Sequence, residues 1–232
     1  MAGVDGCKTG WFCALRDTET GKLCFQLVAN AAGLVQLRHE AAIVAIDIPI
    51  GLPERGSRAC DVAARQRLGR PRGSSVFPAP IRPALAARTR EEASKITELA
   101  DGRRVGAQAF AIVAKIREVD ELLAERPVAR LRLREVHPEV SFAAWNGDSP
   151  LVPSKRSAPG RNARLALVEA WLGKGVLAAA RGARSPAALG DDDILDAIAA
   201  LWTATRIAAG SAGTLPAEPP RDARGLPMEI VY

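Results

Sequence analysis

The sequence predicts an α/β fold: a mixed five-stranded sheet flanked by helices, in which three antiparallel strands precede parallel ones. Two observations lead to this fold class. Three apolar segments within residues 1–28 are joined by short turns that contain glycine, which is typical of antiparallel hairpins. The apolar run at 42–48 is followed by Pro49 and Gly51, which indicates a strand buried on both faces of a sheet.

The first three strands are expected at 1–5, 11–16 and 23–28. The glycines at 6–10 suit a tight turn, and residues 18–22 suit a second one. Because both connections are short, we expect the neighbouring strands to run antiparallel.

Residues 31–40 suit a helix that leads into the fourth strand at 42–48. A helix in this place can cross over the sheet and return the chain parallel to the first strand. The first and fourth strands are therefore expected to be neighbours.

A helical insertion is predicted after the fourth strand, at about 52–130. Ser57 is expected to cap its first helix, and Gly69 is expected to end it. The predicted elements are helices at 58–68, 82–99 and 105–125 and a proline-rich loop at 73–80. Arginines from Arg65 to Arg72 crowd the end of the first helix, where they can face solvent or contact phosphate groups.

The remaining chain completes the sheet, so that residues 1–232 are expected to form one domain. A fifth strand is predicted at 131–136. The other predicted elements are a polar loop at 146–160, helices at 161–172 and from Asp191 to Trp202, an extended tail at 211–225 and a short edge strand at 226–232.

Composition narrows the functional classes. No apolar run reaches the ~18 residues of a membrane span, and the N-terminus lacks the features of a signal peptide. The four cysteines show no CxxC spacing, so we expect reduced thiols and a cytoplasmic protein. The net charge of +6 and the pI near 9.5 favour a polyanionic partner such as nucleic acid.

Two aspartates are expected at one edge of the sheet, where ligands of open α/β sheets bind. Asp5 ends the predicted first strand, and Asp47 ends the fourth. Adjacent strands lie ~4.8 Å apart, so the two carboxylates are expected side by side. Like charges this close raise each other's pKa unless a divalent cation lies between them. The alternative is that each aspartate simply begins a turn.

The last predicted helix brings further acids. Asp192, Asp193 and Asp196 share one helix face at (i, i+3) and (i, i+4) spacing. Capping and the helix dipole explain Asp191 fully and Asp192 largely. They do not explain Asp196, which lies a turn further in among apolar residues, so we expect it to have a function.

Carboxylates are hard oxygen ligands that suit Mg²⁺ or Mn²⁺. Two such ions can activate a water molecule and stabilise the leaving oxygen of a phosphodiester. The candidate metal ligands are Asp5, Asp47, Asp192, Asp193 and Asp196. The candidate substrate-binding residues are Lys8, Ser74, Ser75, His137, Glu139 and Lys155.

Five stretches carry a resemblance to a known group of proteins: Val4–Trp11, Ile46–Leu52, Ser74–Pro78, Glu135–Glu139 and Asp192–Ala197. The predicted order of three antiparallel strands, a crossover helix, a fourth strand with an acid and a late acidic helix resembles the ribonuclease H-like superfamily. Asp5, Asp47 and the pair Asp193 and Asp196 fall where Holliday-junction resolvases of the RuvC type carry their acids. The chain is similar to a bacterial and archaeal domain-of-unknown-function family described as predicted ribonuclease H-like nucleases. The resemblance implies a metal-dependent nuclease whose catalytic carboxylates are Asp5, Asp47, Asp193, Asp196 and Glu135.

One departure concerns the fourth strand, which carries Asp47 where many nucleases of the superfamily place a glutamate nearby. Aspartate has a shorter side chain than glutamate, so Glu135 or Glu139 could supply a carboxylate that reaches further into the site. The sequence leaves both glutamates as candidates. Two other functions stay open. The turn at 5–10 could bind nucleotide phosphates, or the loop at 74–80 could serve a binding module without turnover.

Overall fold

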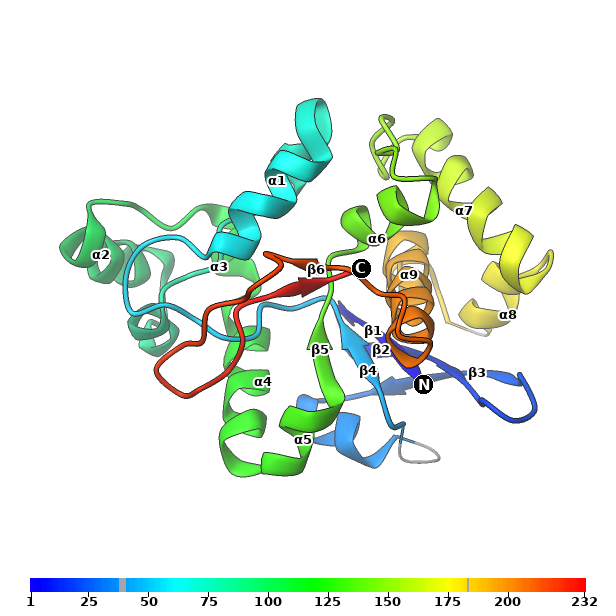
Figure 1. The fold of residues 1–232 in the computed structure, drawn as a ribbon, viewed down its shortest axis with the longest axis horizontal. Coiled ribbons are helices and arrows are strands. Elements are labelled where there is room, and N and C mark those ends of the chain that lie inside the picture. Colours follow the sequence, from blue (N-terminus) through cyan, green and yellow to red (C-terminus); the bar gives the residue numbers. More distant parts are fainter. Residues whose placement is uncertain (38–40, 183) are drawn as a thin grey trace.

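The computed structural model describes residues 1–37, 41–182 and 184–232 (Figure 1). Its main sheet has the strand order β3-β2-β1-β4-β5. The strands are β1 (Ala2–Cys7), β2 (Gly10–Arg16), β3 (Leu23–Val28), β4 (Val44–Ile46) and β5 (Leu133–Glu135). The first three pair antiparallel, whereas β4 runs parallel to β1 and β5 runs parallel to β4. The predicted mixed five-stranded α/β fold is therefore confirmed.

The register between β1 and β4 places two acids side by side. Val4 pairs with Ile46, and the backbone N–H of Asp47 donates to the carbonyl of Val4 at 2.9 Å. Asp5 and Asp47 are each the next residue along these parallel strands. They therefore lie at the same carboxyl edge of the sheet, as the order of the elements predicts.

Both faces of the sheet are covered, because α4 (Val113–Glu125) packs on one and α9 (Asp191–Ala208) on the other (Figure 1). Strand β2 serves both layers. Trp11 and Cys13 point into the layer of α4, and Phe12 and Ala14 point into the layer of α9. All four side chains are buried, which explains why the strand is apolar throughout instead of alternating.

Helix α9 approaches β1 unusually closely. A Cβ atom on Gly3 would lie 2.0 Å from the backbone nitrogen of Leu201 and 2.2 Å from the carbonyl oxygen of Ala197. Only glycine allows this approach, and the approach brings the first turns of α9 to the same edge of the sheet as Asp5.

The insertion lies between β4 and β5, as predicted, but it is more broken than its sequence suggests. It comprises α1 (Ala59–Arg72), η2 (Gly73–Ser75), η3 (Arg82–Ala86), α2 (Arg90–Asp101), α3 (Ala107–Ala111), α4 and α5 (Pro127–Arg132). The expected helix at 82–99 is divided because Thr89 and Glu92 form a capping box that begins a new helix. The expected helix at 105–125 is divided at Ile112.

The predicted cap of the first inserted helix is wrong. Arg58 is the N-cap residue and gives no side-chain cap, while the Ser57 hydroxyl instead accepts a hydrogen bond from Arg103 at 2.5 Å. Gly69, in contrast, interrupts the helix where the sequence predicts. Gly69 adopts a φ of 56°, and both it and Arg70 depart from helical geometry, so the regular helix ends there and only a short turn continues to Arg72.

The predicted crossover helix at 31–40 is present only as a short 3₁₀ helix, η1 (Ala31–Gln36). The Asn30 side chain accepts from the Gly33 N–H at its start. Gly33 lowers the helix propensity of this segment, and a Cβ atom at its position would lie 2.9 Å from the Cβ of Val28. The last part of the prediction, residues 38–40, lies outside the described residues.

The C-terminal half adds helices around the layer of α9 and one small sheet. Its elements are α6 (Pro138–Trp145), α7 (Ala158–Leu172), α8 (Val176–Arg181), α9, β6 (Thr214–Leu215) and β7 (Ile230–Val231). Neither α6 nor α8 is predicted, whereas the terminal strand is. Strand β7 pairs with β6 and makes one parallel bridge from Val231 to Val136, directly after β5.

Among the described residues, no helix has both the length and the apolar composition needed to cross a membrane. The four cysteines are free thiols.

Candidate active site

A cleft of about 670 Å³ opens at the carboxyl ends of β1, β4 and β5. Acids, bases and hydroxyls line it from elements that are far apart in the chain. Its carboxylates are Asp5, Asp47, Asp61, Glu135, Glu139, Asp192 and Asp196; its basic and hydroxyl groups are Arg58, Arg72, Lys115, His137, Lys155, Arg156, Ser74, Ser75 and Ser154. The cleft thus gathers most of the residues that the sequence singles out.

The two strand-end aspartates are held in an environment that penalises their charge. Asp5 is 8% exposed, and one of its carboxylate oxygens accepts from the Gly6 N–H at 2.8 Å. Burial, followed by the charges of Asp47 and Asp196, raises the pKa of Asp5 well above its ordinary value. Burial and the charge of Asp196 likewise raise the pKa of Asp47 to about 8.

Asp196 reaches the same cleft from the second turn of α9. Its side chain is buried, with 1% of the residue exposed. The close packing of α9 on β1 is what brings it to this edge of the sheet. Burial raises the pKa of Asp196, and the adjacent Lys155 ammonium opposes this shift. Lys155 donates to Oδ2, whereas the buried Oδ1 has no hydrogen-bond partner among the residues that the structure describes.

The other two aspartates of α9 have separate positions. Asp193 does not line the cleft; its carboxylate accepts from the Gly190 N–H at 2.9 Å and closes the start of the helix. Asp192 does line the cleft, with Asp196 one turn further along. The aspartate pair that faces the cleft is therefore spaced (i, i+4), whereas the resemblance points to Asp193 and Asp196.

Both glutamates in the cleft are neutralised by buried arginines. Glu135 accepts from Arg58 through both oxygens at 2.7 Å and from the Ile50 N–H at 2.6 Å. Glu139 accepts through both oxygens from Arg164 at 2.7 Å. The three aspartates Asp5, Asp47 and Asp196 have no such arginine partner among the described residues, so the two kinds of acid have different surroundings.

Asp61 completes the pairing of Arg58. It accepts from Arg58 Nη2 at 2.6 Å and from the Ala79 N–H at 2.9 Å, and it is buried. The sequence pattern does not single out Arg58 or Asp61, because Glu135, the partner that joins them into a cluster, lies 77 positions from Arg58. Their role is to hold β5, α1 and the following loop together beside the cleft.

Among the candidate substrate-binding residues, Ser74, Ser75, His137, Glu139 and Lys155 line the cleft. Lys8 does not: it is exposed in the turn between β1 and β2.

Two basic side chains near Ser75 have unused hydrogen-bonding atoms. Arg72 donates to the Ser75 hydroxyl at 2.6 Å, while its buried Nε has no partner among the described residues. The buried Nδ1 of His137 has none either, and burial lowers the pKa of this imidazole, which favours its neutral form. This wall of the cleft therefore offers polar groups opposite the aspartates.

The donor set suits a hard divalent cation, and the unpartnered Oδ1 of Asp196 is the kind of atom that such an ion would satisfy. Yet within residues 1–37, 41–182 and 184–232, no group of three or more His, Cys, Asp or Glu side chains is arranged to hold a metal ion. The chemistry of the residues fits a metal, while their present arrangement is centred on Lys155.

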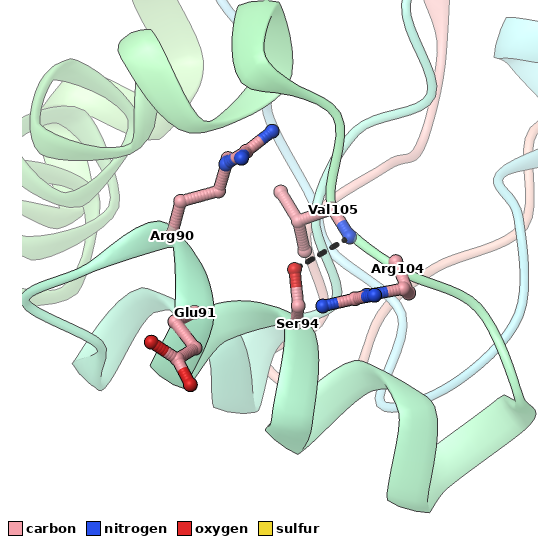
Figure 2. Close-up of a pocket in the computed structure, with 5 residues that line it drawn as sticks. All are labelled: Arg90, Glu91, Ser94, Arg104 and Val105. Carbon is pink, nitrogen blue, oxygen red and sulfur yellow. Dashed lines mark hydrogen bonds between the residues drawn. The ribbon is translucent and has the colours of Figure 1, made fainter.

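A second hollow of about 440 Å³ lies beside α2, away from these acids. Figure 2 shows Arg90 and Arg104 flanking Ser94, whose hydroxyl accepts from the Val105 N–H at 3.2 Å. Its one lining carboxylate, Glu91, pairs with Lys95 on the helix surface. This hollow lacks an acid cluster, so the chemistry predicted from the sequence belongs to the cleft at the sheet edge.

A family model described as "Protein of unknown function (DUF429)" matches residues 3–221. Because this match spans most of the sequence, the chain belongs to that family. No curated protein and no solved structure shows a significant match to the chain.

Proposed function

We propose that the protein is a divalent-metal-dependent nuclease that hydrolyses phosphodiester bonds in DNA or RNA. The observation that carries this proposal is the convergence of Asp5, Asp47 and Asp196 from β1, the end of β4 and α9 into one cleft. Keeping together three acids that have no arginine partner in the described part of the chain costs free energy, as their raised pKa values indicate. Clusters of acids with strongly raised pKa values are typical of functional sites.

The topology supports placing the chain in the ribonuclease H-like superfamily. Three antiparallel strands are followed by parallel strands in the order β3-β2-β1-β4-β5, and a late helix packs on β1. Asp5, Asp47 and Asp196 share the edge at which the sequence resemblance implies the acids, although the second acid of α9 in the cleft is Asp192 and not Asp193. Because a fold alone does not establish an activity, the cleft carries the functional argument.

We assign Asp5, Asp47, Asp192 and Asp196 as the residues that would hold Mg²⁺ or Mn²⁺. When bound, the cation supplies Lewis-acid stabilisation of phosphate charge and lowers the pKa of a water nucleophile. Asp193 is left out of this set because its carboxylate caps α9, and Glu135 and Glu139 are left out because arginines neutralise them. These three residues act as positioning groups.

The basic and hydroxyl groups of the cleft suit the phosphates of a nucleic acid. Lys155 and Arg156 come from one loop, and Ser74, Ser75 and His137 come from other walls. The net charge of +6 also favours a polyanionic partner. Hydrolysis of a phosphodiester needs cationic groups that bind the phosphate charge and a nucleophile that attacks the phosphorus atom. A cleft that holds both cations and carboxylates suits these two requirements.

The alternative of nucleotide-phosphate binding by the turn at residues 5–10 receives less support. Lys8 is the basic residue of that turn. It is exposed and does not line the cleft. The expected cytoplasmic location is kept as part of the proposal, on the ground that the cysteines are free thiols.

Cleavage assays test the proposal. Labelled single strands, duplexes and branched junctions of DNA and RNA are incubated with the protein in Mg²⁺, Mn²⁺ or EDTA. We expect metal-dependent cleavage of at least one substrate by the wild type and by Asp148→Asn, which removes an exposed acid outside the cleft. Asp47→Asn, purified in the same way, should abolish the cleavage. Cleavage that survives Asp47→Asn unchanged would contradict the proposal.

A further inference from the structure

A tightly held loop joins α6 to α7 (Figure 1). It carries Lys155, whose side chain lines the cleft. A Cβ atom on Gly160 would lie 1.9 Å from the carbonyl oxygen of Ser154, so the loop backbone rests directly on the start of α7. The Ser157 hydroxyl donates to the same carbonyl at 2.7 Å. The loop backbone is therefore anchored one residue before Lys155, and the long side chain is the part that extends into the cleft.

The Lys155 ammonium is placed among the same acids that are assigned to the metal. It bonds Oδ2 of Asp196, and its charge also acts on Asp5 and Asp47. Since a lysine amine is ordinarily protonated at neutral pH, its contact with Asp196 is an ion pair. One positive charge thus serves three buried or half-buried carboxylates.

We propose that Lys155 is the resident counter-cation of the aspartate cluster, and that a divalent cation binds by displacing its ammonium from Asp196. This inference rests on the proposed function, since it concerns the same carboxylates. It explains why the donors fit a metal chemically although, among the described residues, no group is arranged to hold one: Lys155 occupies Oδ2 of Asp196, and Oδ1 alone has no partner there.

The competition follows from charge and space. An ammonium and a divalent cation on the same carboxylate repel each other strongly in a site of low dielectric constant. The Lys155 side chain is 35% exposed, whereas that of Asp196 is 2% exposed. The flexible lysine, and not the helix-borne aspartate, is thus the partner that can move. Once displaced towards the open side of the cleft, its ammonium is available to a substrate phosphate.

Calorimetric titration with Mn²⁺ alone tests the displacement. Lys155→Met keeps the length of the side chain and removes its charge, and Lys174→Met makes the same change at an exposed position outside the cleft. We expect Lys155→Met to bind Mn²⁺ about tenfold more tightly than the wild type, or more. Lys174→Met should bind it as the wild type does, which separates the local effect from the change in net charge.

A second measurement uses the wild type and does not depend on the folding of a variant. Acetic anhydride labels deprotonated amines, and peptide mass spectrometry reports the extent of labelling at each lysine. In EDTA, Lys155 should be labelled slowly, because its ammonium is held against the buried Asp196. Saturating Mn²⁺ should speed the labelling of Lys155 and leave that of Lys174 unchanged.

The outcomes separate this inference from the function beneath it. Equal Mn²⁺ affinity in the wild type and Lys155→Met, or unchanged labelling of Lys155 in metal-bound protein, overturns the displacement and leaves the metal site standing. Failure of both proteins to bind Mn²⁺ overturns the metal site and the displacement together.

Discussion

Both carboxylate oxygens of Glu135 accept hydrogen bonds from Arg58, each at 2.7 Å, although the two residues are 77 positions apart. The side chains of both are almost completely buried. This pair answers a question that the sequence leaves open, namely which glutamate supplements the aspartates. In the described structure neither Glu135 nor Glu139 is free to do so, because each is held by an arginine.

Removing one charge of this pair should destabilise the protein strongly. Glu135→Gln leaves the buried Arg58 with a single carboxylate, that of Asp61, and breaking a buried ion pair costs about 3–5 kcal/mol. Glu91→Gln is the matched control, since its exposed pair with Lys95 is worth less than about 1 kcal/mol. Urea unfolding measures both free energies. Similar losses in the two variants would contradict a structural role for Glu135.

Gly3→Ala should disturb the packing that brings Asp196 to Asp5. The new Cβ would lie 2.0 Å from the Leu201 nitrogen, so strand and helix must separate, at a cost of about 1–3 kcal/mol or more. At Gly106 the same substitution meets no atom within 4 Å; Gly106 is the N-cap of α3, so the small preference for glycine there offsets the gain from a stiffer unfolded chain, and stability should change by less than about 1 kcal/mol. Thermal unfolding compares the two. An unaffected melting temperature in Gly3→Ala would show that the approach is not required.

Asp47→Asn should stabilise the metal-free protein increasingly as pH rises. Folding raises the pKa of Asp47 from its ordinary 3.8 to about 8, so the folded state binds this proton more tightly than the unfolded state. The group therefore favours folding below about pH 4, and this contribution is lost as pH rises to about 8. In EDTA, the melting temperature of the variant minus that of the wild type should grow across this range. A difference independent of pH would contradict the shift.

The sheet could be predicted because its signals are local. Apolar runs and glycine turns place β1 to β3 within one or two residues, and the apolar run ending in Asp47 places β4. The pairing of β4 with β1 could be predicted because a crossover connection returns the chain parallel to the first strand. Asp196 could be recognised because a charged residue within an apolar stretch of helix requires an explanation.

The remaining parts of the site depend on contacts that the sequence does not record. Asp193 looks equivalent to Asp196 by spacing, yet it closes the N-terminus of α9, and only the direction of the side chain distinguishes these roles. Glu135 looks like a ligand until Arg58, from another element, is placed beside it. Lys8 and Lys155 both look like phosphate-binding residues, but only Lys155 is carried into the cleft by its loop.

The central claim is that the aspartates facing the cleft bind a divalent cation, and titration of Mn²⁺ by calorimetry tests it most directly. The comparison is between the wild type, Asp196→Asn in the cleft and Asp193→Asn at the helix cap three residues away. We expect the wild type to bind Mn²⁺, Asp196→Asn to lose about tenfold or more in affinity, and Asp193→Asn to keep the affinity with little loss of stability, because its amide oxygen can still accept from the Gly190 N–H. Equal affinity in the wild type and Asp196→Asn, or binding that depends on Asp193 instead, would contradict the account.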